Sequence, residues 1–248
     1  FTQYEPTPHR ANHLSKENKD NGAQLYSWQY ITSGLTAVWA ESNTRGAIFD
    51  AMHRREVYAT TGPRMRVRFF AGWDFDERDA QGRNLAQAGY TKGVPMGGDL
   101  TGAPEGKAPS FLVYALRDPM GANLDRIQVV KGWLDKDGKA QEKVYDVAWS
   151  GERKPGGDGK LPAVGDTVDL SIPSWTNTIG APELGTVWTD PDFDPSLKAF
   201  YYARVIEIPT PRWTAYDRVK FKLDLPKTIP LKTQERAYTS PIWYTPEL

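Results

Sequence analysis

Histidines are the first residues to consider for catalysis, because an imidazole can bind a metal ion or transfer a proton near neutral pH. Two of the three histidines, His9 and His13, are four positions apart. On a helix this spacing would place both rings on one face, as in a zinc site. Pro8 precedes the pair, however, and no glutamate lies between the histidines. We therefore expect no metal site in this chain. His9 and His13 are the weak candidates for one, and the competing interpretation is that both lie in a solvated loop.

Other chemistry has less support in the residues. The alternating carboxylates of Asp190, Asp192 and Asp194 could hold a hard cation, but the segment lacks the glycine and distal glutamate of a calcium-binding loop, so a turn is favoured. No Gly-x-Ser-x-Gly motif occurs, which leaves a serine hydrolase without local support. The absence of cysteine excludes disulfides, thiolate metal sites and a cysteine nucleophile.

The composition is that of a globular protein. The chain has 248 residues, and its 31 basic residues balance its 31 acidic residues. It therefore has no net positive charge to attract nucleic acid. No segment approaches the roughly 20 consecutive apolar residues of a membrane helix. A high aromatic share, 12%, favours strands and aromatic packing. The compartment stays open, whether cytoplasmic, periplasmic or secreted, and a homo-oligomer is possible.

The elements that would position functional residues are mostly strands. Residues 42–45 can cap a helix that continues to Arg55, and residues 56–61 and 64–70 alternate as a strand pair around a Gly62-Pro63 turn. Residues 74–98 and 151–165 are expected to be long loops. Short turn-bounded segments predict a mainly antiparallel sandwich or barrel from strands at residues 110–116, 126–134, 142–149, 167–172, 199–208, 219–225 and 241–244.

One stretch resembles a known family. It consists of residues 34–45 (GLTAVWAESNTR), 48–52 (IFDAM) and 54–64 (RREVYATTGPR), and the likeness continues at residues 94–99 (VPMGGD), 124–132 (LDRIQVVKG), 208–213 (IPTPRW) and 234–244 (QERAYTSPIWY). These segments resemble the domain-of-unknown-function family 3604. The notable relatives of this bacterial group are the polymerase-and-histidinol-phosphatase (PHP) metallohydrolases and, more distantly, carbaryl hydrolase.

The resemblance implies a distorted βα barrel that holds two or three divalent ions (Zn, Mn or Fe), which activate water against a phosphate, ester or amide. In the family, the His-x-His and Asp-x-His ligand motifs precede the GLTAVWAE stretch, and neither motif occurs in this chain. The implied function is therefore the C-terminal part of a hydrolase, inactive alone. Its partners would be the missing N-terminal barrel portion and a small-molecule substrate.

The expected fold is α+β, in two parts. Residues 1–70 would be the closing helix and strand segment of the barrel, with an N-terminal arm, and residues 71–248 a β-rich, sandwich-like domain. A non-enzymatic β-sandwich that binds a partner or a carbohydrate through exposed aromatic residues is the alternative function.

Several residues become site candidates through the same resemblance. The segment 58–64 resembles the last barrel strand and its exit turn, so Tyr58, Thr60 and Thr61 could face the substrate. Arg64, and after it Arg55 and Arg45, could bind an anionic group with two hydrogen bonds. Glu41 could orient a metal ligand. The competing interpretations are surface or interdomain ion pairs for the arginines and a helix N-terminal carboxylate for Glu41.

Overall fold

Strands dominate the protein. The computed structural model describes residues 17–18, 25–26, 28, 34–82, 84–157 and 159–246. It contains 37% strand and 15% helix, which confirms the expected strand-rich α+β architecture. The helices are α2 (Arg45–His53), α3 (Glu77–Gln81), α4 (Leu85–Lys92) and α5 (Trp213–Phe221). None of the helices in the described ranges is both long and apolar enough to cross a bilayer.

The larger sheet has eight strands. Its main path is β10 (Ala140–Trp149), β9 (Leu124–Leu134), β12 (Ala199–Glu207), β15 (Arg236–Thr239), β4 (Val57–Thr60) and β3 (Leu35–Val38), and β16 (Ile242–Tyr244) joins β12 to β7 (Asp99–Leu100). All neighbours are antiparallel except β16 and β7.

The smaller sheet has four antiparallel strands. Their order is β11 (Glu183–Thr189), β8 (Ser110–Leu116), β5 (Arg66–Gly72) and β6 (Gly93–Pro95). Two short ribbons complete the strands, namely β1 (Glu17–Asn18) with β2 (Leu25–Tyr26) and β13 (Thr210–Pro211) with β14 (Lys232–Thr233).

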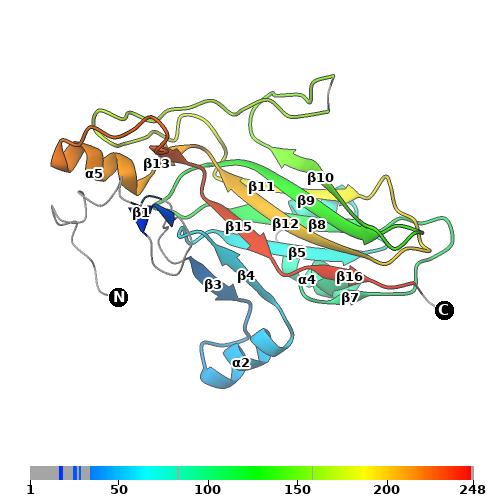
Figure 1. The fold of residues 1–248 in the computed structure, drawn as a ribbon. Helices are drawn as coiled ribbons and strands as arrows, with labels where there is room; N and C mark the ends of the chain where they lie inside the picture. The colour runs from blue at the N-terminus through cyan, green and yellow to red at the C-terminus, as the bar shows by residue number, and fades with distance from the viewer. Residues whose placement is uncertain are drawn as a thin grey trace.

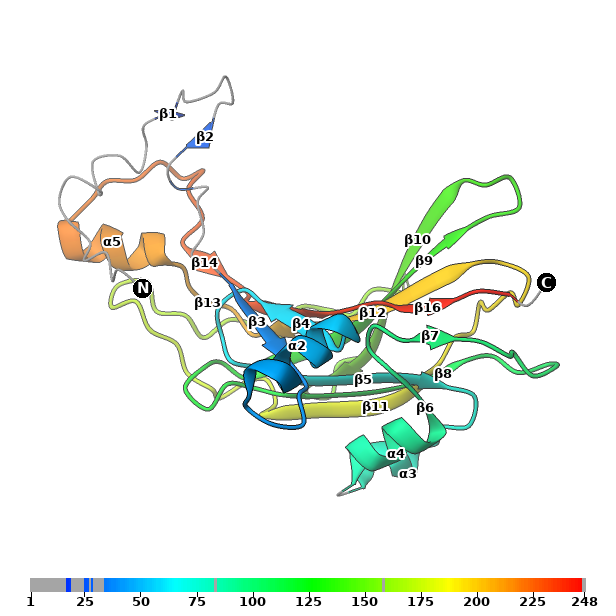
Figure 2. The ribbon, with the colours of Figure 1, turned by 90° about the horizontal axis from the view of Figure 1, so that it is seen from below.

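The two larger sheets form the layers of a sandwich, which Figure 2 shows nearly edge-on. The hydrophobic core lies between them. Every second residue of β12 is buried, as expected for a strand with one face toward the core. The ring of Phe111 on β8 lies 4.5 Å from the ring of Tyr201 on β12 and 5.6 Å from that of Phe69 on β5. These contacts join the layers into one core.

The helix after residue 44 forms as expected. Thr44 is the N-cap residue of α2, and its hydroxyl accepts a hydrogen bond from the amide of Ala47. Only Ala51 of this helix is buried, and the side chains of Phe49 and Met52 are exposed. Figure 1 shows α2 at the lower edge of the sandwich, beyond β3 and β4, and α5 at one end.

Three expectations are wrong. Residues 219–225 alternate apolar and charged side chains, yet residues 213–221 form α5, which buries Ala215 and leaves Val219 exposed. Residues 167–172 do not form a strand: a turn at residues 170–173 is closed by an isolated bridge between Asp169 and Ser174. Residues 74–98 are largely not loop, because α3, α4 and β6 lie in them; Asp76 and Asp79 form a capping box at α3.

The domain boundary expected at residue 70 falls inside β5, one of the two inner strands of the smaller sheet. On the N-terminal side of this boundary, β3 and β4 hydrogen-bond into the same sheet as β9, β12 and β15. Strands from both sides of residue 70 therefore belong to the same sheet.

Candidate functional site

Three segments that are distant in the sequence meet at one end of the larger sheet. The turn after β4 supplies Thr61, the start of α5 supplies Arg212, and the start of β15 supplies Arg236 (Figure 1). They surround a pocket of about 450 Å³, named here the Arg212–Arg236 pocket. Its lining residues are Thr61, Pro211, Arg212, Trp213, Tyr216, Thr233, Gln234, Glu235, Arg236 and Tyr238.

Thr61 connects the turn after β4 to β15. Its amide donates to the carbonyl oxygen of Arg236 over 2.9 Å, and its hydroxyl oxygen accepts from the amide of Arg236, also over 2.9 Å. The hydroxyl itself donates to the carboxylate of Glu235. Because both the backbone and the side chain take part, the pairing of β4 and β15 continues one residue past the end of β4.

Two guanidinium groups give the pocket its positive charge. Burial lowers the pKa of Arg212, and the charge of Glu235 opposes this shift; an arginine nevertheless stays protonated at neutral pH. The Nε of Arg236 donates to the carbonyl oxygen of Gln234 over 3.2 Å. Among the described residues, Arg236 has no carboxylate within ion-pair distance, so its terminal nitrogens can donate to a bound anion.

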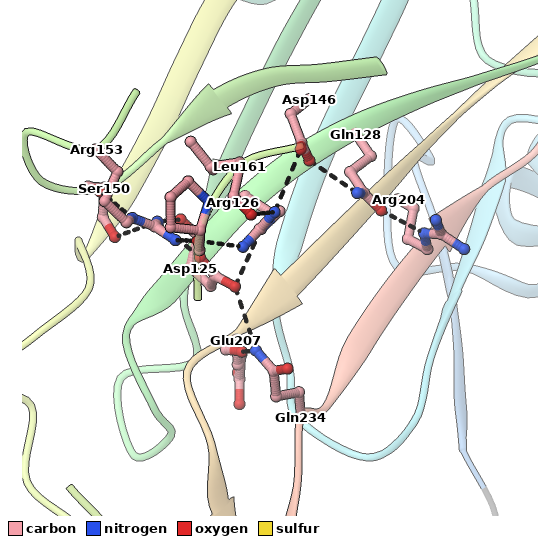
Figure 3. Close-up of polar contacts among 11 residues, drawn as sticks. Asp125, Arg126, Gln128, Asp146, Ser150, Arg153, Leu161, Arg204, Glu207 and Gln234 are labelled. Carbon is pink, nitrogen blue, oxygen red and sulfur yellow. Dashed lines mark hydrogen bonds and ion pairs between the residues drawn. The ribbon is translucent and has the colours of Figure 1, made fainter. Parts of the chain in front are cut away.

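A buried hydrogen-bond network fixes the wall of the pocket at Gln234 (Figure 3). The Nε2 atom of Gln234 donates to Asp125 Oδ2 over 3.2 Å and to the carbonyl oxygen of Glu207 over 2.9 Å. Two arginines surround the buried Asp125: Arg126 Nε is 3.1 Å and Arg153 Nη2 is 2.7 Å from its carboxylate oxygens. The two guanidinium groups compensate for the free-energy cost of burying the charged carboxylate of Asp125.

Glu207 lies behind the pocket at the end of β12. Its side chain is buried, and its Oε1 atom has no hydrogen-bond partner in the described part of the chain. Burial, with smaller contributions from the charges of Glu235 and Asp118, raises the pKa of Glu207 to about 8. The carboxyl group is therefore largely protonated at neutral pH.

Arg64 contacts this region through its backbone. Its amide donates to Asp118 Oδ2 over 2.7 Å, and the amide of Met120 donates to Oδ1 over 2.9 Å. Burial opposes ionisation of Asp118, but these two hydrogen bonds lower its pKa. The side chain of Arg64 is exposed and is not part of the pocket lining.

Tyr58, Thr60 and Thr61 are the candidates of the segment 58–61, and the first two are buried and do not line the pocket. Tyr58 is in the core, where its hydroxyl donates to the carbonyl oxygen of Met65 over 2.9 Å. Thr60 is buried, and its hydroxyl oxygen accepts from the amide of Gly62 over 3.3 Å. Of these three residues, the structure places only Thr61 in the Arg212–Arg236 pocket.

The remaining candidates are on the side of α2. Arg55 forms a surface ion pair with Asp99, with 2.8 Å between Nη2 and Oδ2, and Arg45 is exposed at the start of the helix. Glu41 lines a second cavity of about 460 Å³, together with Trp39, Ala40, Arg54, Glu56, Arg68 and Tyr90. In that cavity the guanidinium of Arg68 lies 3.4 Å from the centre of the Trp39 ring and 3.5 Å from the carboxylate of Glu56.

No metal centre is formed by the described residues, because no three His, Cys, Asp or Glu side chains in these ranges are grouped to hold an ion. His9 and His13 lie outside the described residues.

Arg212, Glu235 and Arg236 were not expected as site residues. They lie inside the segments 208–213 and 234–244 that carry the family resemblance, which was the available signal. The residues of β15 lie in the same pocket as Thr61 because β15 pairs with β4, a contact between residues far apart in the sequence.

Comparison with known proteins gives one match. A family model described as "Protein of unknown function (DUF3604)" matches residues 2–246. No curated protein and no solved structure shows a significant match.

Proposed function

This chain belongs to the DUF3604 family, and we propose that it is the C-terminal part of a metal-dependent hydrolase related to the bacterial PHP metallohydrolases. The substrate class would be a phosphoester, or a carboxylic ester or amide. The chain supplies an anion-binding pocket rather than the metal ions. The proposal rests on one observation, the meeting of Thr61, Arg212 and Arg236 at the end of β4.

The pocket has the properties that an anionic or strongly polarised group requires. Guanidinium groups donate pairs of parallel hydrogen bonds to phosphate or carboxylate oxygens. The volume of about 450 Å³ suits a small molecule. Trp213 and Tyr216 add apolar surface for the rest of the substrate, and Tyr216 is 45% exposed, so the site is open to solvent.

The described residues do not fit a catalytic metal centre. Because the sequence contains neither a His-x-His nor an Asp-x-His motif, the proposal places the Zn, Mn or Fe ions and their ligands in the N-terminal barrel portion, outside this chain. The roles left to this chain are to bind and orient the substrate through Arg212 and Arg236 and to hold the turn at Thr61 in place.

An edge of the larger sheet favours contact with that barrel portion. Within the described residues, β3 pairs with β4 alone, so its second edge offers unpaired backbone groups. Beside it, α2 exposes Phe49 and Met52, at 64% and 55%. This combination would let β3 and α2 close a barrel whose other strands come from the N-terminal portion.

The experiment is an assay of the complete protein loaded in turn with Zn²⁺, Mn²⁺ or Fe²⁺. The probes are 4-nitrophenyl phosphate, bis(4-nitrophenyl) phosphate, 4-nitrophenyl acetate and 4-nitroacetanilide. We expect metal-dependent turnover of at least one probe and none with this chain alone. Absence of turnover for every probe with every metal, or equal turnover without metal, would contradict the proposal.

A different surface favours a second candidate function, a non-enzymatic module that binds a partner or a carbohydrate. The side chains of Phe200 and Trp243 form an aromatic surface on the outer face of the larger sheet. This surface does not require the metal centre.

A further inference from the structure

A groove of about 510 Å³ crosses the outer face of the larger sheet near the C-terminal end of the chain. It runs over β9, β12 and β16, where Gly132 pairs with Phe200 and Phe200 pairs with Trp243. Phe200 and Trp243 alternate with the buried residues Tyr201 and Ile242, so their side chains point away from the core. Gly132 follows the buried Lys131 and lies on the same outer face. The groove is thus separate from the Arg212–Arg236 pocket.

Two aromatic rings shape the groove. The ring centres of Phe200 and Trp243 are 5.2 Å apart, and their planes make an angle of 50°. Trp243 is 43% exposed. A Cβ atom at Gly132 would lie 2.4 Å from the Phe200 ring, so glycine at this position allows the ring to lie flat on the backbone of β9.

The rim of the groove carries both hydrogen-bond donors and acceptors. Glu142 and Lys198 line it and are exposed. Within the described part of the chain, neither the carboxylate of Glu142 nor the ammonium group of Lys198 forms an ion pair. The nearby ion pair of β10 is between Lys143 and Asp192. One carboxylate and one ammonium group leave the rim without net charge, which disfavours a strongly charged ligand.

We propose that this groove binds a neutral saccharide. A pyranose ring has an apolar face of C–H groups that packs on an aromatic ring, and its edge carries hydroxyls that donate to Glu142 and accept from Lys198. The inference rests on the second candidate function and is independent of the hydrolase proposal, because binding here requires neither the metal nor the Arg212–Arg236 pocket. A nucleic acid would meet no net positive charge at this rim.

The test is isothermal titration of the chain with cellohexaose, xylohexaose and chitohexaose. A hexaproline peptide is the competing ligand, since a proline helix also packs on exposed aromatic rings. We expect at least one hexasaccharide to bind with a dissociation constant on the order of 1 mM or below. Binding should weaken about tenfold or more in Trp243→Ala and partly recover in Trp243→Phe.

Matched variants separate the groove from general effects. Met120→Ala removes an apolar side chain that is 88% exposed and does not line the groove, so it should leave binding unchanged. Glu142→Ala should weaken binding several-fold, and melting curves should show every variant folded. The proposal is overturned if no hexasaccharide binds up to about 10 mM, if Trp243→Ala binds as well as the wild type, or if only hexaproline binds.

Discussion

The hydroxyl oxygen of Thr61 accepts a hydrogen bond from the backbone amide of Arg236, with 2.9 Å between the two atoms. The same hydroxyl donates to Glu235. Together with the backbone hydrogen bond from the Thr61 amide to the carbonyl oxygen of Arg236, this side chain holds the start of β15 against the turn after β4, and with it the position of the Arg236 side chain in the pocket.

Replacement of Thr61 by valine should destabilise the protein by about 1–2 kcal/mol, because the partly buried amide of Arg236 loses its acceptor. Thr61→Ser keeps the hydroxyl and should cost about half as much or less. Urea unfolding of both variants measures the difference. Equal stability of the valine and serine variants would show that the hydroxyl does not hold β15.

Glu207 should make the protein less stable as the pH rises. The pKa of Glu207 is about 8 in the folded protein, above the ordinary value of 4.5, so the folded state holds the proton more tightly than the unfolded chain. Its contribution is fully present below about pH 4.5 and is lost as the pH rises toward 8. The unfolding free energy should fall by up to a few kcal/mol across this window.

Glu207→Gln should remove this fall, because the amide keeps the shape of the protonated acid and does not titrate. Urea unfolding at pH 5, 6.5 and 8 compares the variant with the wild type. The matched control is the exposed Glu142→Gln, which should behave as the wild type. The same slope in Glu207→Gln and the wild type would assign the pH dependence to other groups.

Lys131 and Asp190 form a buried ion pair with 2.7 Å between Nζ and Oδ2, and the hydroxyl of Tyr201 also donates to Asp190. Lys131→Met should destabilise the protein by about 3–5 kcal/mol, because Asp190 is left charged and buried. Adding Asp190→Asn should recover part of this loss. Chemical unfolding of the single and double variants checks the coupling, and purely additive effects would contradict it.

Arg64 is a candidate separate from the Arg212–Arg236 pocket, because its exposed side chain does not line that pocket. Arg64→Ala should lower turnover of the complete hydrolase about 10²-fold if the guanidinium binds substrate in the transition state. Arg64→Lys should recover little, because an ammonium group lacks the planar pair of donors. The backbone contact to Asp118 is retained in both variants, so a loss would come from the side chain. Unchanged turnover with a lowered melting temperature would make Arg64 a structural residue.

Local patterns in the sequence predicted much of the fold. The strand at residues 110–116 has the predicted bounds, and the helix after Thr44 begins at its expected cap. The strand predicted at residues 219–225 was wrong. The alternation of apolar and charged residues there is typical of a strand, but residues 213–221 form a helix in which Val219 is exposed. Alternation of apolar and charged residues alone does not show which side chains will be buried.

The candidate site was only partly predictable. Thr61 was a candidate from its segment, but its partner Glu235 is 174 residues away. No local spacing predicts that β15 lies beside β4, so Arg212 and Arg236 could not be joined to Thr61 from the sequence. Pairing of strands distant in sequence depends on the whole sandwich and its buried core.

The most direct measurement is the kcat and KM of the complete, metal-loaded protein for its best anionic probe, in the wild type, Arg236→Ala and Arg236→Lys. The control is Arg78→Ala, which removes an arginine on α3 that is 89% exposed and pairs with Asp76. If the pocket binds the anionic group of the substrate, Arg236→Ala should lower kcat/KM about 10²-fold or more, lysine should restore only part, and the control should match the wild type. A folded Arg236→Ala variant with wild-type kcat/KM would contradict the account.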